Sequence, residues 1–224
     1  MRQYKNYLIF FRTLLTSFIL HPPLFATESI DCYKIATKVE KQFNIPHKLL
    51  SSISITEAGT TKNGYYQAWP WSINNNGKSI YFNNKGEMIN FINNAISSKQ
   101  INLDIGCMQI NYKYHGKKFK DINSMTNPEE NIYYAGKFLK ELYTRYRSWN
   151  TAISRYHSSD PKKMKVYLKK VTKNWEKNRE GMYEIKNSLK VINSKKAEIR
   201  KKKNINSKII HFRKLLRQEK TLIM

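Results

Sequence analysis

Apolar residues recur at helical spacing along most of the chain, and they predict a mainly α domain. The predicted helices cover about residues 29–43, 46–57, 88–96, 127–142, 148–156 and 160–179. Cys32 lies on the apolar face of the first helix, and Pro46 suits the first turn of the second. The second helix is expected to end near Glu57, because Ala58 and Gly59 begin a stop sequence.

A β-hairpin is expected to interrupt the helices between residues 69 and 82. There Asn76 and Gly77 separate two short apolar runs, a strong local indication of a tight turn. After Gly181 apolar residues become sparse among lysines, which predicts a loose helix or a disordered tail. The expected fold class is mainly α (α+β), with one small β-hairpin insertion and a basic C-terminal tail.

The N-terminal residues have the layout of an export signal. A positive start precedes a mostly apolar stretch at residues 8–20, and Pro22 and Pro23 break any helix before the small residue Ala26. We therefore predict a signal peptide over residues 1–26 and export to the periplasm or cell envelope. An uncleaved membrane anchor is the alternative for this segment.

The chain of 224 residues has a formal net charge of +25, and much of that charge lies near the C-terminus. Residues 160–224 contain 21 Lys or Arg and 6 Asp or Glu. A basic protein is attracted to polyanions, although an AT-rich coding sequence would give a similar composition. We divide the mature chain into a domain at 27–160 and a basic helix and tail at 161–224. The tail is expected to bind the anionic envelope, with transient membrane contact, or acidic partners, and no specific nucleic acid.

The chain has two cysteines, Cys32 and Cys107, and both lie in the portion expected to be exported. In an oxidising compartment two thiols of one domain tend to pair, so we predict a disulfide between them. Two buried free thiols are the alternative. Two cysteines without matched histidine spacing do not form a zinc site, and neither a metal nor a cofactor is expected.

Four short motifs stand out from the helical background. They are Thr56-Glu57-Ala58-Gly59, Gly106-Cys107-Met108-Gln109-Ile110-Asn111, Asn131-Ile132-Tyr133-Tyr134-Ala135-Gly136-Lys137-Phe138-Leu139 and Ala152-Ile153-Ser154-Arg155-Tyr156-His157-Ser158. In this order and spacing they resemble the soluble lytic transglycosylase (SLT) family of the lysozyme-like superfamily, over about residues 30–160. The Trp-Pro-Trp before the hairpin and the Tyr-His-Ser of the last motif resemble the branch found beside conjugation and envelope-spanning secretion systems.

The resemblance implies a lysozyme-like fold and cleavage of the β-1,4 bond between N-acetylmuramic acid and N-acetylglucosamine in peptidoglycan. Four positions depart from the family pattern. Ala58 stands for serine, Cys107 for leucine, Phe138 for tyrosine and His157 for asparagine. Ala58 and His157 bring into question the hydrogen bonds around the acid, but the acid itself is retained as Glu57.

Glu57 is the expected catalytic acid, because a carboxyl kept protonated by apolar neighbours can protonate the leaving oxygen of a glycosidic bond. By resemblance, Gln109 and Asn111 hydrogen-bond the sugar chain, Tyr156 orients Glu57 through its hydroxyl, and Tyr133 forms a wall of the groove. Met108 is expected beside the acid and the substrate, although Met108 and Tyr133 would equally suit the core.

We expect this groove to be built from residues before Ser159. Two other functions stay open: a muramidase that uses water, and a glycan-binding assembly protein without catalysis. In each case the partner is the peptidoglycan glycan strand, and a secretion or conjugation apparatus is a further candidate partner.

Overall fold

The computed structural model describes residues 30–222, apart from residue 63. The signal peptide predicted at residues 1–26 lies outside the described residues. The helices are α1 (Cys32–Gln42), α2 (Leu49–Ala58), α3 (Lys85–Ser97), α4 (Tyr112–His115), α5 (Ile122–Met125), α6 (Pro128–Tyr146), α7 (Trp149–His157), α8 (Pro161–Arg179) and α9 (Met182–Leu222), with a short 3-10 helix at Gly116–Lys118. The strands are β1 (Gly59–Lys62), β2 (Tyr65–Ala68), β3 (Ser72–Asn75), β4 (Lys78–Tyr81), β5 (Leu103–Ile105) and β6 (Ile110–Asn111). The mainly α (α+β) fold class is confirmed.

Helix α2 is the centre of the domain, and nearly all of its side chains are buried. Leu49, Leu50 and Ile53 are completely buried, and α1 and α8 both pack against this helix. A helix that is buried on every side has little amphipathic character. Its serines are compatible with burial because their hydroxyls are hydrogen-bonded; Ser54, for example, donates to the carbonyl of Cys107 at 3.1 Å.

A carboxylate from another helix caps the N-terminus of α2. Residue Lys48 occupies the cap position in a left-handed conformation and contributes no side-chain cap. Glu40 of α1 instead accepts hydrogen bonds from the backbone N–H of Lys48 at 2.9 Å and of Ser51 at 2.8 Å. Negative charge is favourable at a helix N-terminus, so this contact fixes α1 against the start of α2. Burial raises the pKa of Glu40, and the two backbone hydrogen bonds oppose that rise.

Two small sheets lie beside the helices. The Asn-Gly hairpin is confirmed as β3–β4, and Asn76 and Gly77 both have positive φ, as a two-residue turn of this kind requires. Strands β5 and β6 extend it to a four-stranded sheet of order β4-β3-β5-β6. The β1–β2 hairpin, which begins where a simple helix stop was expected, was not predicted. Its first residue, Gly59, admits no side chain, because an added Cβ would lie 2.2 Å from the Ile55 carbonyl oxygen.

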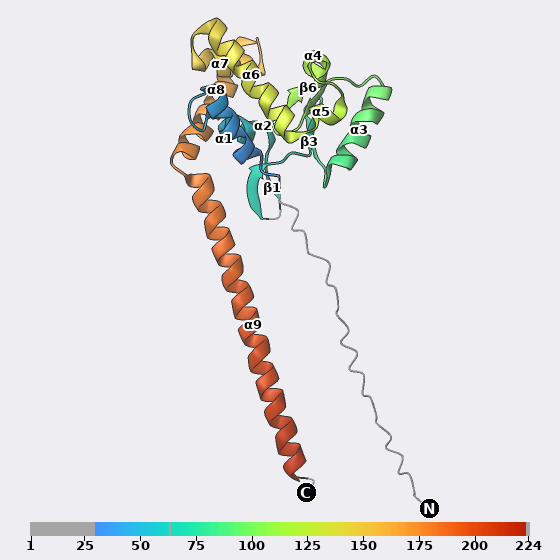
Figure 1. Ribbon diagram of the computed structural model, residues 1–224, viewed down its shortest axis with the longest axis vertical. Coiled ribbons are helices and arrows are strands. Elements are labelled where there is room, and N and C mark those ends of the chain that lie inside the picture. The colour runs from blue at the N-terminus through green and yellow to red at the C-terminus, as the bar shows by residue number, and fades with distance from the viewer. Residues whose placement is uncertain (1–29, 63, 223–224) are drawn as a thin grey trace, which may run out of the picture.

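Helix α8 packs onto the domain although the predicted boundary was at residue 160. Tyr167 and Val171 are buried in the core, and Asn178 donates to the hydroxyls of Ser51 and Ser52 on α2. The packed body therefore continues to about Arg179. Helix α9 then leaves this body as one long helix (Figure 1).

No helix within the described part of the chain combines the length and apolar character needed to cross a membrane.

The predicted disulfide between Cys32 and Cys107 is present. Both cysteines are buried, and the bond joins the first residue of α1 to the loop between β5 and β6. It closes a loop with a sequence separation of 75 residues. A loop of that length loses substantial entropy in the unfolded chain when it is closed, so the bond stabilises the folded domain.

Reduction of this disulfide is expected to lower the free energy of unfolding by about 4 kcal/mol, on the loop-entropy estimate. Urea unfolding with and without dithiothreitol measures the change. The double variant Cys32→Ala/Cys107→Ala serves as the control, since its stability should not respond to the reductant. Labelling of both thiols by a maleimide in the unfolded, unreduced protein would contradict the bond.

Candidate active site

Glu57 lies at the last turn of α2, at the junction of two cavities. The first, the amide cavity, has a volume of 480 Å³ and is lined by Asn74, Asn102, Asp104, Gln109, Ile110, Asn111, Tyr114, His115, Phe138, Tyr156, His157, Ser158 and Lys163 besides Glu57. The second, the lysine cavity, has a volume of 530 Å³ and is lined by Thr56, Asn74, Ser79, His157, Lys162, Lys163, Val166, Tyr167 and Lys170 besides Glu57. Because the two cavities share Glu57, Asn74, His157 and Lys163, they form one groove that crosses the carboxyl group.

The carboxyl group of Glu57 is held by a tyrosine from α8. The Tyr167 hydroxyl donates a hydrogen bond of 2.5 Å to Oε1 of Glu57. The ring of His157 stacks on the ring of Tyr167, with the two centroids 4.4 Å apart and the planes nearly parallel. The expectation that the groove is built only from residues before Ser159 is therefore wrong. Among the described residues, no protein group hydrogen-bonds to the second oxygen, Oε2.

Burial raises the pKa of Glu57 from its ordinary value of 4.5 to about 7. The hydrogen bond from Tyr167 and the charge of Lys170 act in the opposite direction, while the charge of Asp104 adds to the rise. A carboxyl group with this pKa is populated in both protonation states near neutral pH. It can donate a proton and take one back without a large free-energy cost.

Tyr156 and Met108 occupy positions different from those the resemblance implied. The Tyr156 hydroxyl donates to the Met108 carbonyl at 2.9 Å, so it braces the loop before β6, and Tyr167 has the contact with Glu57 that was expected of Tyr156. The Met108 side chain is completely buried and lines neither cavity. Met108 therefore belongs to the core, in line with the alternative left open for it.

A buried asparagine links two of the four motifs. Asn131 of α6 accepts from the backbone N–H of Met108 at 3.0 Å and donates to the carbonyls of Ile105 and Met125. These bonds fix the turn that carries Gln109. Gln109 itself has φ of 44°, an uncommon backbone conformation for a residue with a side chain, and such conformations cluster at functional sites. Its Nε2 lies 3.0 Å from the Gly106 carbonyl oxygen.

Asp104 and Asn111 face each other across the short β5–β6 pair on the wall of the amide cavity. The Asn111 side chain donates to Asp104 at 2.8 Å and to Asn102 at 2.9 Å. Burial raises the pKa of Asp104, whereas the hydrogen bond from Asn111 and the nearby His157 act against that rise. The cavity therefore offers several amide groups and two carboxyl groups, a lining that suits a polyhydroxylated ligand.

A family model described as the transglycosylase SLT domain matches residues 34–179. The chain belongs to this family. Neither a curated protein nor a solved structure matches it. At the level of the family, membership indicates peptidoglycan-directed activity of the transglycosylase type and an extracytoplasmic place of action.

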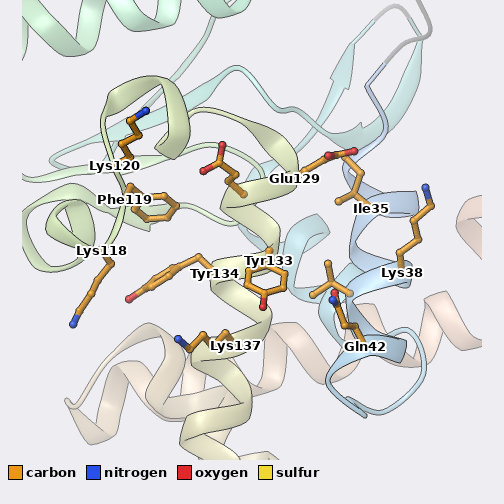
Figure 2. Close-up of a pocket in the computed structure, with 12 residues that line it drawn as sticks. Ile35, Lys38, Gln42, Lys118, Phe119, Lys120, Glu129, Tyr133, Tyr134 and Lys137 are labelled. Atoms are coloured by element: carbon orange, nitrogen blue, oxygen red, sulfur yellow. The ribbon is translucent and has the colours of Figure 1, made fainter.

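Tyr133 does not lie with the other predicted site residues of the SLT domain. It lines a separate cavity of 520 Å³ between α1, α6 and residues 118–120, together with Ile35, Lys38, Val39, Gln42, Lys118, Phe119, Lys120, Glu129, Glu130, Tyr134 and Lys137. Figure 2 shows the Tyr133 ring facing Gln42 and Ile35 of α1 across this space. Tyr133 is 45% exposed, and its ring contacts Phe43 rather than any group near Glu57. It is neither a wall of the groove nor a core residue.

The structure adds Tyr167 and Asn131 to the residues that build the site of the SLT domain. Asn131 was part of a motif but had no expected role. The amphipathic pattern of α8 was recognised, and within it Tyr167, Val171, Asn174 and Asn178 follow each other at three- or four-residue steps. Asparagines in line with the apolar residues of a helix need hydrogen-bond partners. Asn174 and Asn178 are therefore the feature of the sequence that indicates packing of α8 on the domain.

Within the described part of the chain, no group of three or more His, Cys, Asp or Glu side chains is arranged to hold a metal ion.

The raised pKa makes a prediction about stability. A carboxyl group with a folded pKa near 7 and an ordinary unfolded value of 4.5 costs no stability below pH 4.5, and stability is lost as the pH rises through 7. Glu57→Gln removes this loss. The free energy of unfolding of the variant minus that of the parent should therefore be greater at pH 8 than at pH 4, by about 3 kcal/mol. Urea unfolding at both pH values measures it. The matched control is Glu176→Gln, an exposed carboxyl on α8, whose effect should be small at both. If the difference in free energy of unfolding between Glu57→Gln and the parent were the same at both pH values, the pKa of Glu57 would not be raised.

Proposed function

We propose that this SLT domain is a peptidoglycan lytic transglycosylase in which Glu57 acts first as acid and then as base. The observation that carries the proposal is one carboxyl group, with its pKa raised to about 7, placed where two halves of a groove meet. A glycan strand lying along the groove would cross that carboxyl group. The substrate bond is the β-1,4 bond from N-acetylmuramic acid to N-acetylglucosamine.

The reaction balances with one glutamate. Protonated Glu57 gives its proton to the glycosidic oxygen, the bond from C1 of muramic acid to that oxygen breaks, and N-acetylglucosamine leaves with a free hydroxyl. The Glu57 carboxylate then takes the proton from the C6 hydroxyl of the same muramic acid, and that oxygen bonds to C1. The product is a 1,6-anhydro ring, no water is consumed, and Glu57 ends in its protonated form.

Tyr167 has a positioning role in this scheme. Its hydroxyl donates a hydrogen bond to Oε1 of Glu57, so Oε2 is the oxygen that exchanges the proton with the substrate. Holding the carboxyl group in one orientation favours proton transfer to a leaving oxygen at hydrogen-bond distance. Gln109 and Asn111 line the amide cavity, and we propose that their amides bind sugar hydroxyl or N-acetyl groups. Tyr156 supports the same wall through the Met108 carbonyl.

A hydrolytic muramidase is the second candidate, and Asp104 is the observation that favours it. Its carboxyl group lines the amide cavity with Glu57, and its charge acts on the pKa of Glu57. A second carboxylate near the sugar can activate a water molecule, and the product would then carry a reducing end. Asp104 is already hydrogen-bonded to Asn111, which is why the single-glutamate route is preferred.

Export to the periplasm or cell envelope is part of the proposal, because the substrate lies outside the cytoplasm. Association with a conjugation or secretion apparatus rests on the Trp-Pro-Trp and Tyr-His-Ser sequences, and it stays a prediction. The basic helix α9 is proposed to hold the enzyme to anionic wall or membrane polymers. The non-catalytic glycan-binding protein is the less favoured alternative, because glycan binding alone does not require an acid with a raised pKa in the groove.

Glu57→Gln is expected to remove nearly all turnover, at least 1,000-fold, while glycan binding is retained, since the amide keeps the shape of the carboxyl but cannot supply a proton. Mass spectrometry of digested peptidoglycan measures both rate and product, because an anhydro end is lighter than a reducing end by one water. Asp104→Asn is the comparison variant and should keep the anhydro product. Reducing ends from the parent protein, lost in Asp104→Asn, would establish the muramidase instead.

Removal of the chain after Gly181 should leave cleavage of short soluble strands within about twofold of the parent, because the groove ends with α8. The same truncation should weaken binding to intact walls at low salt. That difference should vanish in half-molar salt, where the Debye length is about 4 Å. Truncation after Asp160 removes Tyr167 and should abolish cleavage. Loss of activity already after Gly181 would mean that α9 is needed for the groove.

A further inference from the structure

The two halves of the groove differ in charge. The amide cavity is lined mainly by uncharged polar and aromatic side chains, with Asp104 beside Glu57 and one lysine at the boundary. The lysine cavity has three lysines, Lys162, Lys163 and Lys170, and its one carboxyl group is that of Glu57 itself. A linear glycan that runs through both halves therefore meets amides on one side of the cleaved bond and positive charge on the other.

The lysines of the cavity come from one face of α8. Lys162, Val166 and Lys170 follow each other at four-residue steps and so lie in one row along the helix, beside Tyr167. Lys165, Lys169 and Lys173 belong to the same helix, are exposed, and line neither half of the groove. Because these three lysines lie on the same helix but line neither half of the groove, they provide an internal comparison for the lysines of the cavity.

The chemistry of the substrate suggests what these lysines bind. The sugar rings of peptidoglycan are uncharged, but each N-acetylmuramic acid carries, on its lactyl group, a stem peptide that bears free carboxylates. Glu57 acts at the muramic acid, so the stem of that sugar must lie close to the acid. We propose that the lysine cavity binds the carboxylates of this stem peptide and selects strands that bear unamidated stems. This inference rests on the proposed function.

Binding of a carboxylate in this cavity would also favour the acid step. Lys170 lowers the pKa of Glu57 through its charge. A substrate carboxylate close to Lys170 offsets that charge, and the proton is then retained more strongly on Glu57 in the complex. The free enzyme and the complex with a charged stem are therefore expected to differ in the pH at which Glu57 ionises, in the upward direction for the complex.

The expected effect of a single lysine is modest, because the side chains in the cavity are open to solvent. One exposed pair of opposite charges changes an equilibrium by about 1.5- to 5-fold. Lys162 is the best position for a test, since Lys163 and Lys170 also act on the pKa of His157 and Lys170 acts on that of Glu57. A change at Lys162 can thus alter stem binding without altering the titration of the acid.

The experiment compares two substrates of the same size: glycan strands with free stem carboxylates, and the same strands after conversion of those carboxylates to primary amides. The parent should cleave the charged strands with a KM about fivefold lower or more. Lys162→Gln should raise KM for the charged strands about threefold, with kcat unchanged, and should not change KM for the amidated strands. Lys162→Arg should retain the parent values, and Lys165→Gln should behave as the parent, because Lys165 is an exposed lysine of α8 that lines neither half of the groove.

The outcomes separate the two proposals. If the parent cleaves both substrates with the same KM, the stem-binding inference is overturned while the lytic activity stands. An effect of Lys165→Gln as large as that of Lys162→Gln would also overturn it, because the charge of α8 would then act without regard to position. If the parent cleaves neither substrate, the proposed function itself fails.

Discussion

The burial of one carboxyl group determines most of what surrounds it. A glutamate at the C-terminal end of an apolar helix is unfavourable when ionised, because neither burial nor the helix dipole supports a negative charge there. The fold tolerates Glu57 by supplying the Tyr167 hydroxyl at 2.5 Å and by leaving its pKa near 7. The same cost in stability is what gives the group useful acid–base chemistry, so stability and function oppose each other at this residue.

Three contacts hold α2 and the groove loop in a fixed relation. Glu40 caps the start of α2, the disulfide of Cys107 joins the loop to α1, and Asn131 fixes the same loop to α6. All three are buried, and the two hydrogen-bonded contacts have no competition from water there. The wall that carries Gln109 and Asn111 is therefore attached to the central helix from several directions, and the distance across the groove is set by the core.

The sequence predicted the elements whose patterns are local. The periodicity of α6, the Asn-Gly turn of β3–β4 and the pair Cys32 and Cys107 each follow from neighbouring residues or from the absence of other candidates, and all are present. Three of the four motifs supplied Glu57, Gln109, Asn111 and Tyr156, which all line the amide cavity. The contact of Tyr167 and the separate location of Tyr133 depend on how helices cross, and a motif does not record on which side of a helix the groove lies. The β1–β2 hairpin was missed because each of its strands has only 4 residues, too few to show an alternating pattern.

The hydrogen bond between Tyr167 and Glu57 joins residues 110 positions apart in the chain. Contacts of such separation form only after the chain between them has been ordered, since the entropy of closing a long loop must be overcome first. A ribosome releases Glu57 long before it releases Tyr167, so a nascent or prematurely terminated chain holds the acid without the group that orients it. Completion of the groove is thereby coupled to completion of the folded domain.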